Sequence, residues 1–333
     1  YKKNKRDLPW RQNTNPYNVW ISEIMLQQTR VEAVIPYFQR FLTELPNISS
    51  LATVKEDRLL KLWEGLGYYS RAKNLKKCAQ VIEENYHGKM PETFEELKKL
   101  PGIGFYTAGA IASISFHEPV GAIDGNVLRI FSRLYLDFDD ITKEKTKRKY
   151  FEKIKSFIPS ENPGEFNQAL MDLGATICIP NGKAKCEQCP IAKECLAYQQ
   201  GKVDMLPQKS PKKERTVEEK TIFLYTYQDE IAIKKRPKTG LLASLYEYPN
   251  QKGFWTEKDI QEDAKKKKLP IKNILYVKES SHIFSHIKWN MIGYEIPVKE
   301  KIEGFLWVKK EELFSKYSIP TAFKTYTEYL KNK

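Results

Sequence analysis

Between residues 100 and 129 lie a glycine-containing turn that could bind a phosphate and a single carboxylate that could act on a sugar. The turn Leu100–Gly104 (LPGIG) lies between two helical patterns, and its glycines let backbone N–H groups point at a phosphate. Asp124 is a lone carboxylate in an apolar run and is followed at once by Gly125 and Asn126. We therefore predict that the turn binds a DNA backbone and that Asp124 acts on the sugar of one nucleotide. The alternatives are a packed turn between helices and, for Asp124, a helix N-cap, which is compatible with catalysis.

The cysteines indicate a metal centre, because four of the five lie between residues 178 and 195. They form the array C-x7-C-x2-C-x5-C (Cys178, Cys186, Cys189 and Cys195), while Cys78 stands apart. Disulfide scaffolds of secreted proteins spread their cysteines through a short chain, which is not the case here. Thiolates this close in sequence most often hold zinc or an iron–sulfur cluster, and the spacing alone does not decide which.

The balance of charges favours a polyanionic partner. Lys and Arg number 56 against 42 Asp and Glu, which gives a net charge of +14. Basic side chains release counterions when they neutralise phosphates, although a basic surface kept for solubility would give the same count. With 333 residues, 41% of them hydrophobic, the chain can form two packed domains, and no apolar run approaches a membrane span. No targeting pattern precedes the first helix, so we expect an intracellular protein of the cytoplasm, associated with the nucleoid.

Helical periodicity dominates the chain before residue 200. A helix is predicted from Val19 to about Ile35, and Glu23 lies off its apolar stripe, which on periodicity alone indicates a solvated side chain. A loop is predicted over 46–52, and further helices over Glu56–Glu64, Ala72–Tyr86, Glu92–Leu100, Phe105–Ser115, Lys145–Phe157 and Glu165–Ala175, with another after Asp124. The two helices beside the LPGIG turn form a helix–hairpin–helix pattern. The small, aromatic and basic residues over 65–71 suit stacking on a nucleic acid, or a packed turn.

The pattern changes after the cysteines. The segment 201–217 has few apolar residues and many Lys, Pro and Ser, as expected of a linker. Strands are then predicted over Thr221–Tyr227 and Glu230–Arg236, joined as a hairpin at Gln228-Asp229, and over 273–278, 283–296 and 305–308, with a helix over 256–268. The expected fold is therefore multi-domain: an all-α domain over 1–203, an interdomain linker over 204–217 and an α+β domain over 218–333.

In combination, these segments resemble the helix–hairpin–helix DNA glycosylases and, more narrowly, the adenine DNA glycosylases of the MutY family. The resemblance covers nearly the whole chain and rests on 8–11, 22–29, 63–71, 100–108, 124–129, 166–174, the four cysteines, 240–243 and 284–286. It implies a base excision repair enzyme that hydrolyses the N-glycosidic bond of adenine mispaired with 8-oxoguanine or guanine. The implied partner is duplex DNA carrying that mispair, bound by a monomer. The implied architecture is a helix–hairpin–helix glycosylase domain with an iron–sulfur cluster subdomain, followed by a Nudix-like domain that recognises 8-oxoguanine.

The resemblance also implies a cofactor, a [4Fe-4S] cluster held by Cys178, Cys186, Cys189 and Cys195. One departure concerns the first two of these cysteines. The family usually has six residues between them, whereas this chain has seven. A loop can absorb one additional residue, so we retain the cluster as the expected cofactor.

Roles for individual residues follow from the same resemblance. Glu23 corresponds to the general acid that protonates adenine N7, which requires burial and a raised pKa. Asp124 corresponds to the ionised carboxylate that stabilises the oxocarbenium-like sugar or bonds to it transiently. The base must first leave the helical stack. For DNA contacts the resemblance implies Gln28 and Tyr68 as wedges, Thr29, Leu66, Ser285 and His286 near 8-oxoguanine, Gly102 and Gly104 on a phosphate, and Trp10, Arg11, Leu26 and Gln168 in the adenine pocket.

Tyr106 is the residue that separates this chain from bifunctional relatives. In enzymes such as endonuclease III this position is a lysine, whose amine forms a Schiff base and cleaves the strand. A tyrosine cannot do this, so the resemblance implies a monofunctional glycosylase that leaves an abasic site.

Three other functions fit parts of the sequence. An endonuclease III-like enzyme for oxidised pyrimidines shares the turn, the Asp and the cysteines, but it would have Lys at position 106 and no β domain. A nucleotide pyrophosphatase would need metal-binding carboxylates that nothing between Gly253 and Pro270 supplies, so the β domain is expected to bind and not to hydrolyse. A non-enzymatic DNA-binding protein with a metal-stapled domain explains the charge and the cysteines, but gives no reason for Glu23 together with Asp124.

Overall fold

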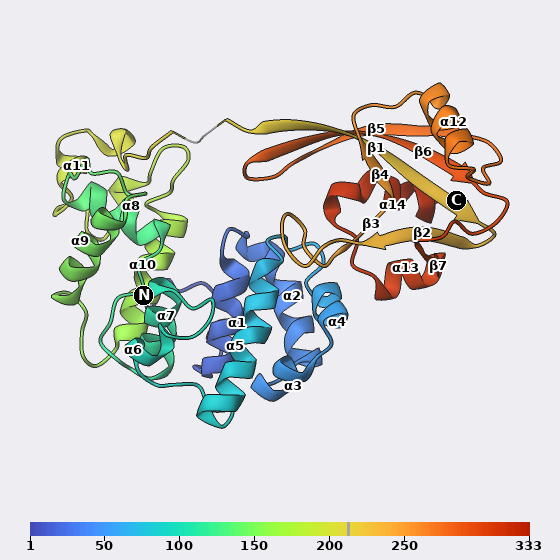
Figure 1. Ribbon diagram of the computed structural model, residues 1–333. Coiled ribbons are helices and arrows are strands. Elements are labelled where there is room, and N and C mark those ends of the chain that lie inside the picture. The colour runs from blue at the N-terminus through green and yellow to red at the C-terminus, as the bar shows by residue number, and fades with distance from the viewer. Residues whose placement is uncertain (212–213) are drawn as a thin grey trace. The chain divides into compact units, whose positions relative to one another are not determined.

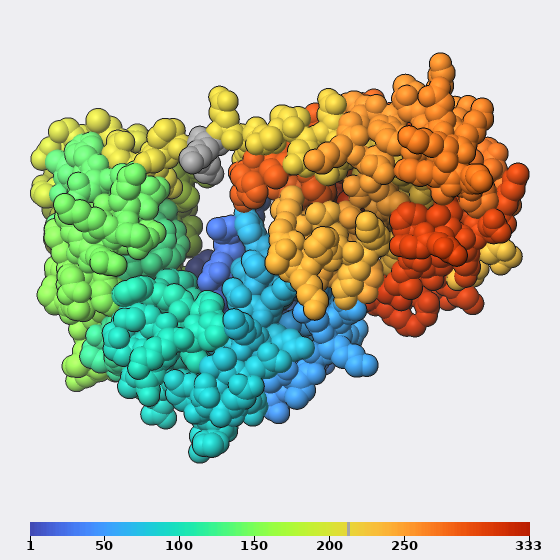
Figure 2. All heavy atoms as spheres, viewed as in Figure 1, coloured from blue at the N-terminus to red at the C-terminus, as the bar shows by residue number. Residues whose placement is uncertain are grey.

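The computed structural model describes residues 1–211 and 214–333, and its contacts divide the chain into two compact units (Figure 1). Unit 1 comprises residues 1–53 and 74–211, and unit 2 comprises residues 54–73 and 212–333. Figure 2 draws one face of the molecule with all heavy atoms, in which the described residues after 214 are yellow to red. The predicted domain boundaries at 203 and 218 stay predictions, and residues 212 and 213 of the predicted linker lie outside the described residues. None of the described helices combines the length and the hydropathy that crossing a bilayer requires.

Unit 1 is built from helices throughout its described residues. They are α1 (Pro16–Leu26), α2 (Val31–Glu44), α3 (Ile48–Thr53), most of α5 (Ser70–Tyr86), α6 (Phe94–Leu97), α7 (Phe105–Ser115), α8 (Gly125–Leu134), α9 (Glu144–Lys155), α10 (Pro163–Thr176) and α11 (Leu196–Gln199), with 3-10 turns η1 (Pro9–Arg11), η2 (Cys186–Gln188) and η3 (Val203–Met205). The all-α prediction for this part is confirmed. The predicted bounds of α7 match the structure, and α6 and α7 are the two helices of the helix–hairpin–helix.

Helix α7 is the centre of unit 1, since its residues from Thr107 to Ile114 are all buried and it packs against α1, α6 and α10. Its small side chains permit this close packing. A Cβ atom at Gly109 would lie 2.2 Å from the carbonyl oxygen of Gly121. Glycine at this position therefore lets the segment that leads to Asp124 lie directly against α7.

Two helix predictions and one loop prediction in unit 1 are wrong. The single helix expected from Val19 to about Ile35 is two helices, because Gln28 has φ 59° and so lies in the left-handed region, which a right-handed helix does not contain. The loop expected over 46–52 contains α3, whose first turn is held by Asn47 accepting from Ser50 N at 2.8 Å. The helix expected over Glu92–Leu100 is only α6, which Thr93 caps.

Unit 2 is an α+β fold around one mixed sheet. Its strands are β1 (Thr216–Tyr227), β2 (Glu230–Lys235), β3 (Tyr246–Glu247), β4 (Asn250–Lys252), β5 (Leu275–Ile283), β6 (Ile287–Pro297) and β7 (Leu306–Lys309), and its helices are α4 (Glu56–Leu62), α12 (Glu257–Lys266), α13 (Lys310–Lys316) and α14 (Lys324–Lys331), with a 3-10 turn η4 (Thr321–Phe323). The strand order is β3-β2-β1-β6-β5, with β4 beside β1 and β7 beside β2. The predicted hairpin is confirmed by the pair Tyr227↔Glu230, and β1 runs parallel to β6.

Alternation along β1 gives the sheet two buried faces. Ile222 and Leu224 belong to the core that includes residues of α13 and α14, whereas Phe223 and Tyr225 belong to the core that includes Ile260 of α12. Figure 1 shows α12 and α14 on opposite sides of the sheet. The strand predicted over 283–296 is wrong at its start, because β5 ends at Ile283 and residues 284–286 form the turn to β6.

Candidate active site

A cavity of about 510 Å³ in unit 1 collects most of the predicted site residues. Those that line it are Trp10, Arg11, Glu23, Leu26, Gln28, Thr29, Tyr106, Asp124 and Gln168. They come from η1, α1, the break between α1 and α2, α7, the start of α8 and α10. Periodicity could not place them together, since they are spread over more than 150 residues. Arg6, Asn126 and Met171 also line the cavity and were not predicted.

Glu23 lies on α1 and is only 5% exposed, so the solvated side chain that periodicity favoured is wrong. Its Oε2 accepts a hydrogen bond from the hydroxyl of Tyr106. The pKa of Glu23 is raised from 4.5 to about 7, mainly by burial. The Tyr106 hydrogen bond and the charge of Arg11 act against this rise, and the charge of Asp124 adds to it. Glu23 can therefore hold a proton near neutral pH.

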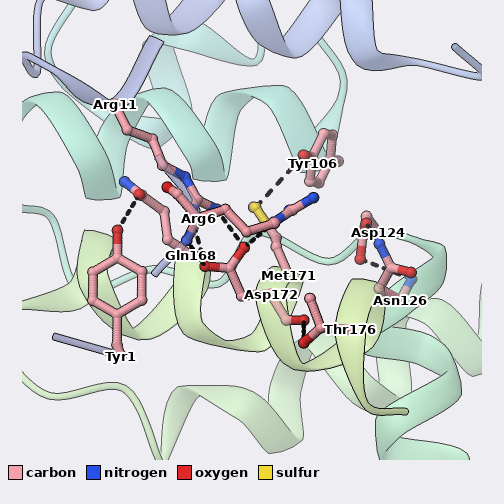
Figure 3. A network of polar contacts seen from close by, with 10 residues as sticks. All are labelled: Tyr1, Arg6, Arg11, Tyr106, Asp124, Asn126, Gln168, Met171, Asp172 and Thr176. Atoms are coloured by element: carbon pink, nitrogen blue, oxygen red, sulfur yellow. Dashed lines mark hydrogen bonds and ion pairs between the residues drawn. The ribbon is translucent and has the colours of Figure 1, made fainter. Parts of the chain in front are cut away.

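Tyr106 is the second residue of α7 and faces Glu23 and Met171. Its hydroxyl lies 4.0 Å from Met171 Sδ, and Figure 3 shows the ring turned toward that sulfur. Burial and the neighbouring carboxylates of Glu23 and Asp124 raise the pKa of Tyr106 well above its ordinary value. The phenol thus stays neutral and acts as a hydrogen-bond donor to Glu23.

Asp124 is the N-cap of α8, as predicted. Its Oδ1 accepts from the backbone N–H groups of Asn126 and Val127, both at 2.8 Å. Its Oδ2 accepts from Asn126 Nδ2 at 2.7 Å, and Figure 3 shows these two side chains side by side. The pKa of Asp124 is raised above its ordinary value, because the effect of burial exceeds the lowering effect of these three donors and of the Arg129 charge. Since all three partners are N–H donors, the arrangement stabilises the ionised form. Glu23 and Asp124 therefore face one cavity with different hydrogen-bond partners: a phenol hydroxyl donates to Glu23, and three N–H groups donate to Asp124.

A chain of hydrogen bonds connects Asp124 to the cysteine segment. Asn126 Oδ1 accepts from Arg129 at 2.8 Å, which fixes the amide orientation that lets Asn126 donate to Asp124. Arg129 Nε in turn donates to the carbonyl oxygen of Cys178 at 2.8 Å. A Cβ atom at Gly174 would lie 2.5 Å from Asn126 Cβ, so glycine there lets α10 approach the start of α8.

The four predicted metal ligands, Cys178, Cys186, Cys189 and Cys195, line one small cavity of about 30 Å³. They are partly buried, and none of them forms a disulfide. Arg133 donates to Cys178 Sγ at 3.2 Å. Within residues 1–211 and 214–333, no group of three or more His, Cys, Asp or Glu side chains is gathered to hold a metal ion. Four thiols that line one cavity are a donor set that both iron–sulfur clusters and zinc sites use.

The LPGIG turn leaves its backbone open to solvent. Gly102 has φ 77°, and a Cβ atom there would lie 2.7 Å from Asn74 Cβ, so both conformation and space require glycine. Gly104 is the N-cap of α7 and gives no side-chain hydrogen bond, so the first N–H groups of this helix have no side-chain cap. Both glycines are exposed.

The remaining predicted residues lie in unit 2. Tyr68 is 49% exposed with φ 47°, and its hydroxyl lies 3.3 Å from Ser285 Oγ. Ser285 and His286 are exposed in the turn between β5 and β6. The structure thus brings Tyr68 and Ser285 together, although 217 residues separate them. Leu66, by contrast, is buried at 6% exposure.

Family models match both parts of the chain. Residues 21–156 match the model of the HhH-GPD superfamily base excision DNA repair protein, and residues 221–329 match that of the NUDIX domain. The adenine DNA glycosylase of Buchnera aphidicola (subspecies Acyrthosiphon pisum) is 40% identical over 286 residues, which cover 86% of this chain and 81% of that relative. The human adenine DNA glycosylase is 32% identical over 391 residues, covering 97% of this chain and 71% of that protein.

Solved structures match the helical part. A thermostable thymine-DNA glycosylase superposes with a TM-score of 0.55 and 28% identity, covering 60% of this chain and 91% of that one. A non-covalent endonuclease III–DNA complex gives a TM-score of 0.51 at 22% identity, covering 60% of this chain and 90% of that one. At that identity the second match establishes the fold alone.

Proposed function

The chain belongs to the family of adenine DNA glycosylases, and we propose that it removes adenine paired with 8-oxoguanine or guanine from duplex DNA in base excision repair. The observation that carries this proposal is the pair of carboxyl groups, Glu23 and Asp124, which face one cavity, the first bound by the Tyr106 hydroxyl and the second by three N–H donors. A net charge of +14 suits a DNA partner.

Glu23 is the proposed general acid. Adenine leaves poorly as an anion, and protonation at N7 turns it into a neutral leaving group. A carboxyl group whose pKa burial raises to about 7 carries the proton at neutral pH and is acidic enough to give it up. The hydroxyl of Tyr106 fixes the orientation of this carboxyl group through its hydrogen bond to Oε2.

Asp124 is the proposed stabiliser of the sugar cation. As the base leaves, positive charge develops at the sugar, and an ionised carboxylate nearby lowers the energy of that state. Its three N–H donors keep Asp124 from turning away while leaving lone pairs for the sugar. The same group can bond to the sugar transiently before water completes hydrolysis.

Tyr106 supports a monofunctional enzyme. The bifunctional chemistry needs an amine that attacks the sugar, and the side chain at this position is a phenol that donates to Glu23. The expected product is therefore an intact strand with an abasic site.

The helix–hairpin–helix turn is the proposed phosphate anchor. The exposed backbone of Gly102 and Gly104 and the uncapped N–H groups of α7 form an anion site of the kind found at helix N-termini. By resemblance we assign Gln28 and Tyr68 to wedging the duplex open so that adenine can be extruded, and Trp10, Arg11, Leu26 and Gln168 to the adenine pocket.

Unit 2 is the proposed reader of 8-oxoguanine. Ser285 and His286 lie exposed in one turn, with the exposed Tyr68 beside Ser285, and a serine hydroxyl can pair with the N7–H or O8 of that base. Thr29 and Leu66 complete the assignment by resemblance. Hydrolysis by this unit is disfavoured, because the acidic residues of α12 serve local roles: Asp259 in the capping box with Thr256, and Asp263 in a pair with Lys267.

We propose a [4Fe-4S] cluster held by Cys178, Cys186, Cys189 and Cys195. When bound, it would clamp the segment from 178 to 195 as a structural and electrostatic centre. Arg133, which donates to Cys178 Sγ, would lower the negative charge that a thiolate-bound cluster brings. The additional residue between the first two cysteines lies in the loop before η2.

The test is single-turnover release of adenine from duplexes with adenine opposite 8-oxoguanine. We expect release by the intact protein and a loss of at least 100-fold in Asp124→Asn, which keeps the shape but not the charge. Asp139→Asn, a carboxylate change on the surface of the same unit, is the matched control. No release by the intact protein would overturn the proposed function, and full release by Asp124→Asn would overturn the role of Asp124.

A further inference from the structure

A partly buried ion-pair cluster forms part of the wall of the cavity. Asp172 on α10 accepts from Arg6 Nε at 2.6 Å and from both terminal nitrogens of Arg11, at 2.7 and 2.9 Å. Figure 3 shows the two guanidinium groups converging on this carboxylate. Arg6 and Arg11 line the cavity, whereas Asp172 does not. The side chains of Arg11 and Asp172 are each 10% exposed, so water screens this pair little.

The position of Arg11 creates a conflict with the chemistry of the cavity. Glu23 has to be protonated to act as an acid, and a guanidinium group paired with it would hold it ionised. Arg11 lines the same cavity, and its charge already acts on Glu23 in that direction. A second carboxylate that binds Arg11 through two parallel hydrogen bonds removes this conflict.

We propose that Asp172 is a positioning residue that fixes Arg6 and Arg11 in the pocket wall and thereby keeps Arg11 from forming an ion pair with Glu23. The proposal rests on the proposed function, in which Glu23 is the acid. Asp172 itself does not touch the base. Its effect on adenine release passes entirely through the two arginines.

The charges around both carboxylates support this assignment. Glu23 faces Tyr106 from α7, Asp124 from the start of α8 and Arg11 from η1. Asp172 faces Arg6 and Arg11. Burial acts to raise the pKa of Asp172, but the hydrogen bonds and charges of the two arginines outweigh it, so the pKa is lowered. Asp172 therefore stays ionised over the range in which Glu23 titrates.

The same cluster ties the first residues of the chain to α10. Tyr1 donates to Gln168 Oε1, and the guanidinium of Arg11 lies over the Tyr1 ring at 5.9 Å. Glu165, also on α10, is the other acidic group that acts on Tyr1. The segment before and around Trp10 is thus bound to α10 by several contacts. The contacts with Asp172 are the ion pairs among them.

The experiment is the pH profile of single-turnover adenine release by Asp172→Asn. The amide keeps the shape but cannot neutralise Arg11, which then turns to Glu23 and stabilises its ionised form. We expect the decline of the rate with rising pH to move at least one pH unit lower, with about a tenfold loss at pH 8 and near wild-type rates at pH 5.5. Asp172→Glu, which keeps the charge, should follow the wild-type profile.

Two further measurements make the test decisive. Adding Arg11→Gln to Asp172→Asn removes the released cation, so the profile should return to its wild-type position even if the rate stays low. Titration of the Glu23 carboxyl group by 13C NMR gives the same readout without DNA, which separates this inference from the proposed function. If Asp172→Asn does not fold, Arg11→Lys is the substitute, because lysine cannot form a bidentate pair with Asp172. This variant should also shift the titration of Glu23 to lower pH. A rate loss that is equal at every pH, with an unshifted Glu23 titration, would overturn the proposal.

Discussion

The burial that raises the pKa of Glu23 also lowers the free energy of unfolding near neutral pH. An unfolded chain would ionise this carboxyl group near pH 4.5, whereas burial raises its pKa in the folded protein to about 7. Below the unfolded pKa the carboxyl group is protonated in both states, so its ionisation does not reduce the free energy of unfolding. As pH rises toward the folded pKa, only the unfolded state loses the proton, and the free energy of unfolding falls. The protein therefore loses stability between about pH 4.5 and pH 7 at this residue.

Replacing the acid by its neutral amide should remove that loss. We expect Glu23→Gln to raise the free energy of unfolding by about 1–3 kcal/mol at pH 8 and to change it little at pH 5, because only the ionised acid is costly to bury. Adenine release should be lost at both pH values. Chemical unfolding at the two pH values measures the difference. An equal effect at pH 5 and pH 8 would mean that packing, not ionisation, dominates at this position.

Tyr106 gives the second test at the level of a single residue. We expect Tyr106→Lys to add strand cleavage and a borohydride-trapped adduct, because the amine would lie beside Glu23 at the cavity where the sugar is proposed to bind. Denaturing electrophoresis after borohydride treatment detects both products. Tyr106→Phe, which has neither hydroxyl nor amine, is the control and should give no adduct. If the wild-type protein formed the adduct as efficiently as the Tyr106→Lys variant, the monofunctional assignment would be contradicted.

Some residues of the site could be predicted from the sequence and others could not. Asp124 was predictable as an N-cap from the residues alone, because the cap signal is local. Glu23 was not, since periodicity treats a polar residue off the apolar stripe as solvated, whereas here it is buried against Tyr106. Asp172 has no local signal at all, because its partners are 161 and 166 residues away.

At the level of elements, α8 connects the cysteine segment to Asp124, the proposed catalytic carboxylate. Arg129 sits one turn into this helix and bonds both to Asn126 and to the carbonyl oxygen of Cys178. It also donates to the carbonyl oxygen of Gly174 on α10 at 2.9 Å. One buried side chain thus joins α8, α10 and the segment that carries the proposed cluster.

Loss of the Arg129 side chain should affect both Asp124, through Asn126, and the cysteine segment, through Cys178. We expect Arg129→Gln to lower adenine release on the order of tenfold and to reduce the iron content per polypeptide, as removal of groups behind metal ligands generally does. Iron analysis and single-turnover assays measure the two effects. Arg148→Gln, at an exposed position of α9, is the matched control. Normal iron content with normal release would show that the connection is only structural.

Element boundaries were predictable where the signals are local and strong. The bounds of α7 follow from the LPGIG turn before it and the change of pattern after Ser115. The break between α1 and α2 was missed because Gln28 carries no sequence signal for a left-handed conformation. Gln28 and Thr29, which lie at this break, both line the cavity. The helices α13 and α14 were also missed, although α14 contributes Tyr326 and Leu330 to the core of unit 2.

At the scale of the whole molecule, the unexpected feature is that residues 54–73 belong to unit 2, although the match to the glycosylase family model includes them. Glu64 accepts from the backbone N–H of Ile319 at 2.8 Å, and Lys61 donates to the carbonyl oxygen of Tyr317 at 2.9 Å. Lys235 pairs with Asp57 at 2.6 Å. Two of these partners are backbone groups about 255 residues away, which no sequence pattern encodes.

These contacts make a prediction about base recognition, because α4 leads directly into the turn that carries Tyr68. Glu64→Ala would leave the buried Ile319 N–H without its acceptor, at a cost of about 1–3 kcal/mol, and would loosen that turn beside Ser285. We therefore expect adenine release opposite 8-oxoguanine to fall several-fold, while release opposite guanine changes little. Glu262→Ala, an exposed acid on α12, is the matched control, and both duplexes are compared in single-turnover assays. Equal losses on both duplexes would mean that the segment 54–73 supports the fold of unit 2 without taking part in reading the opposite base.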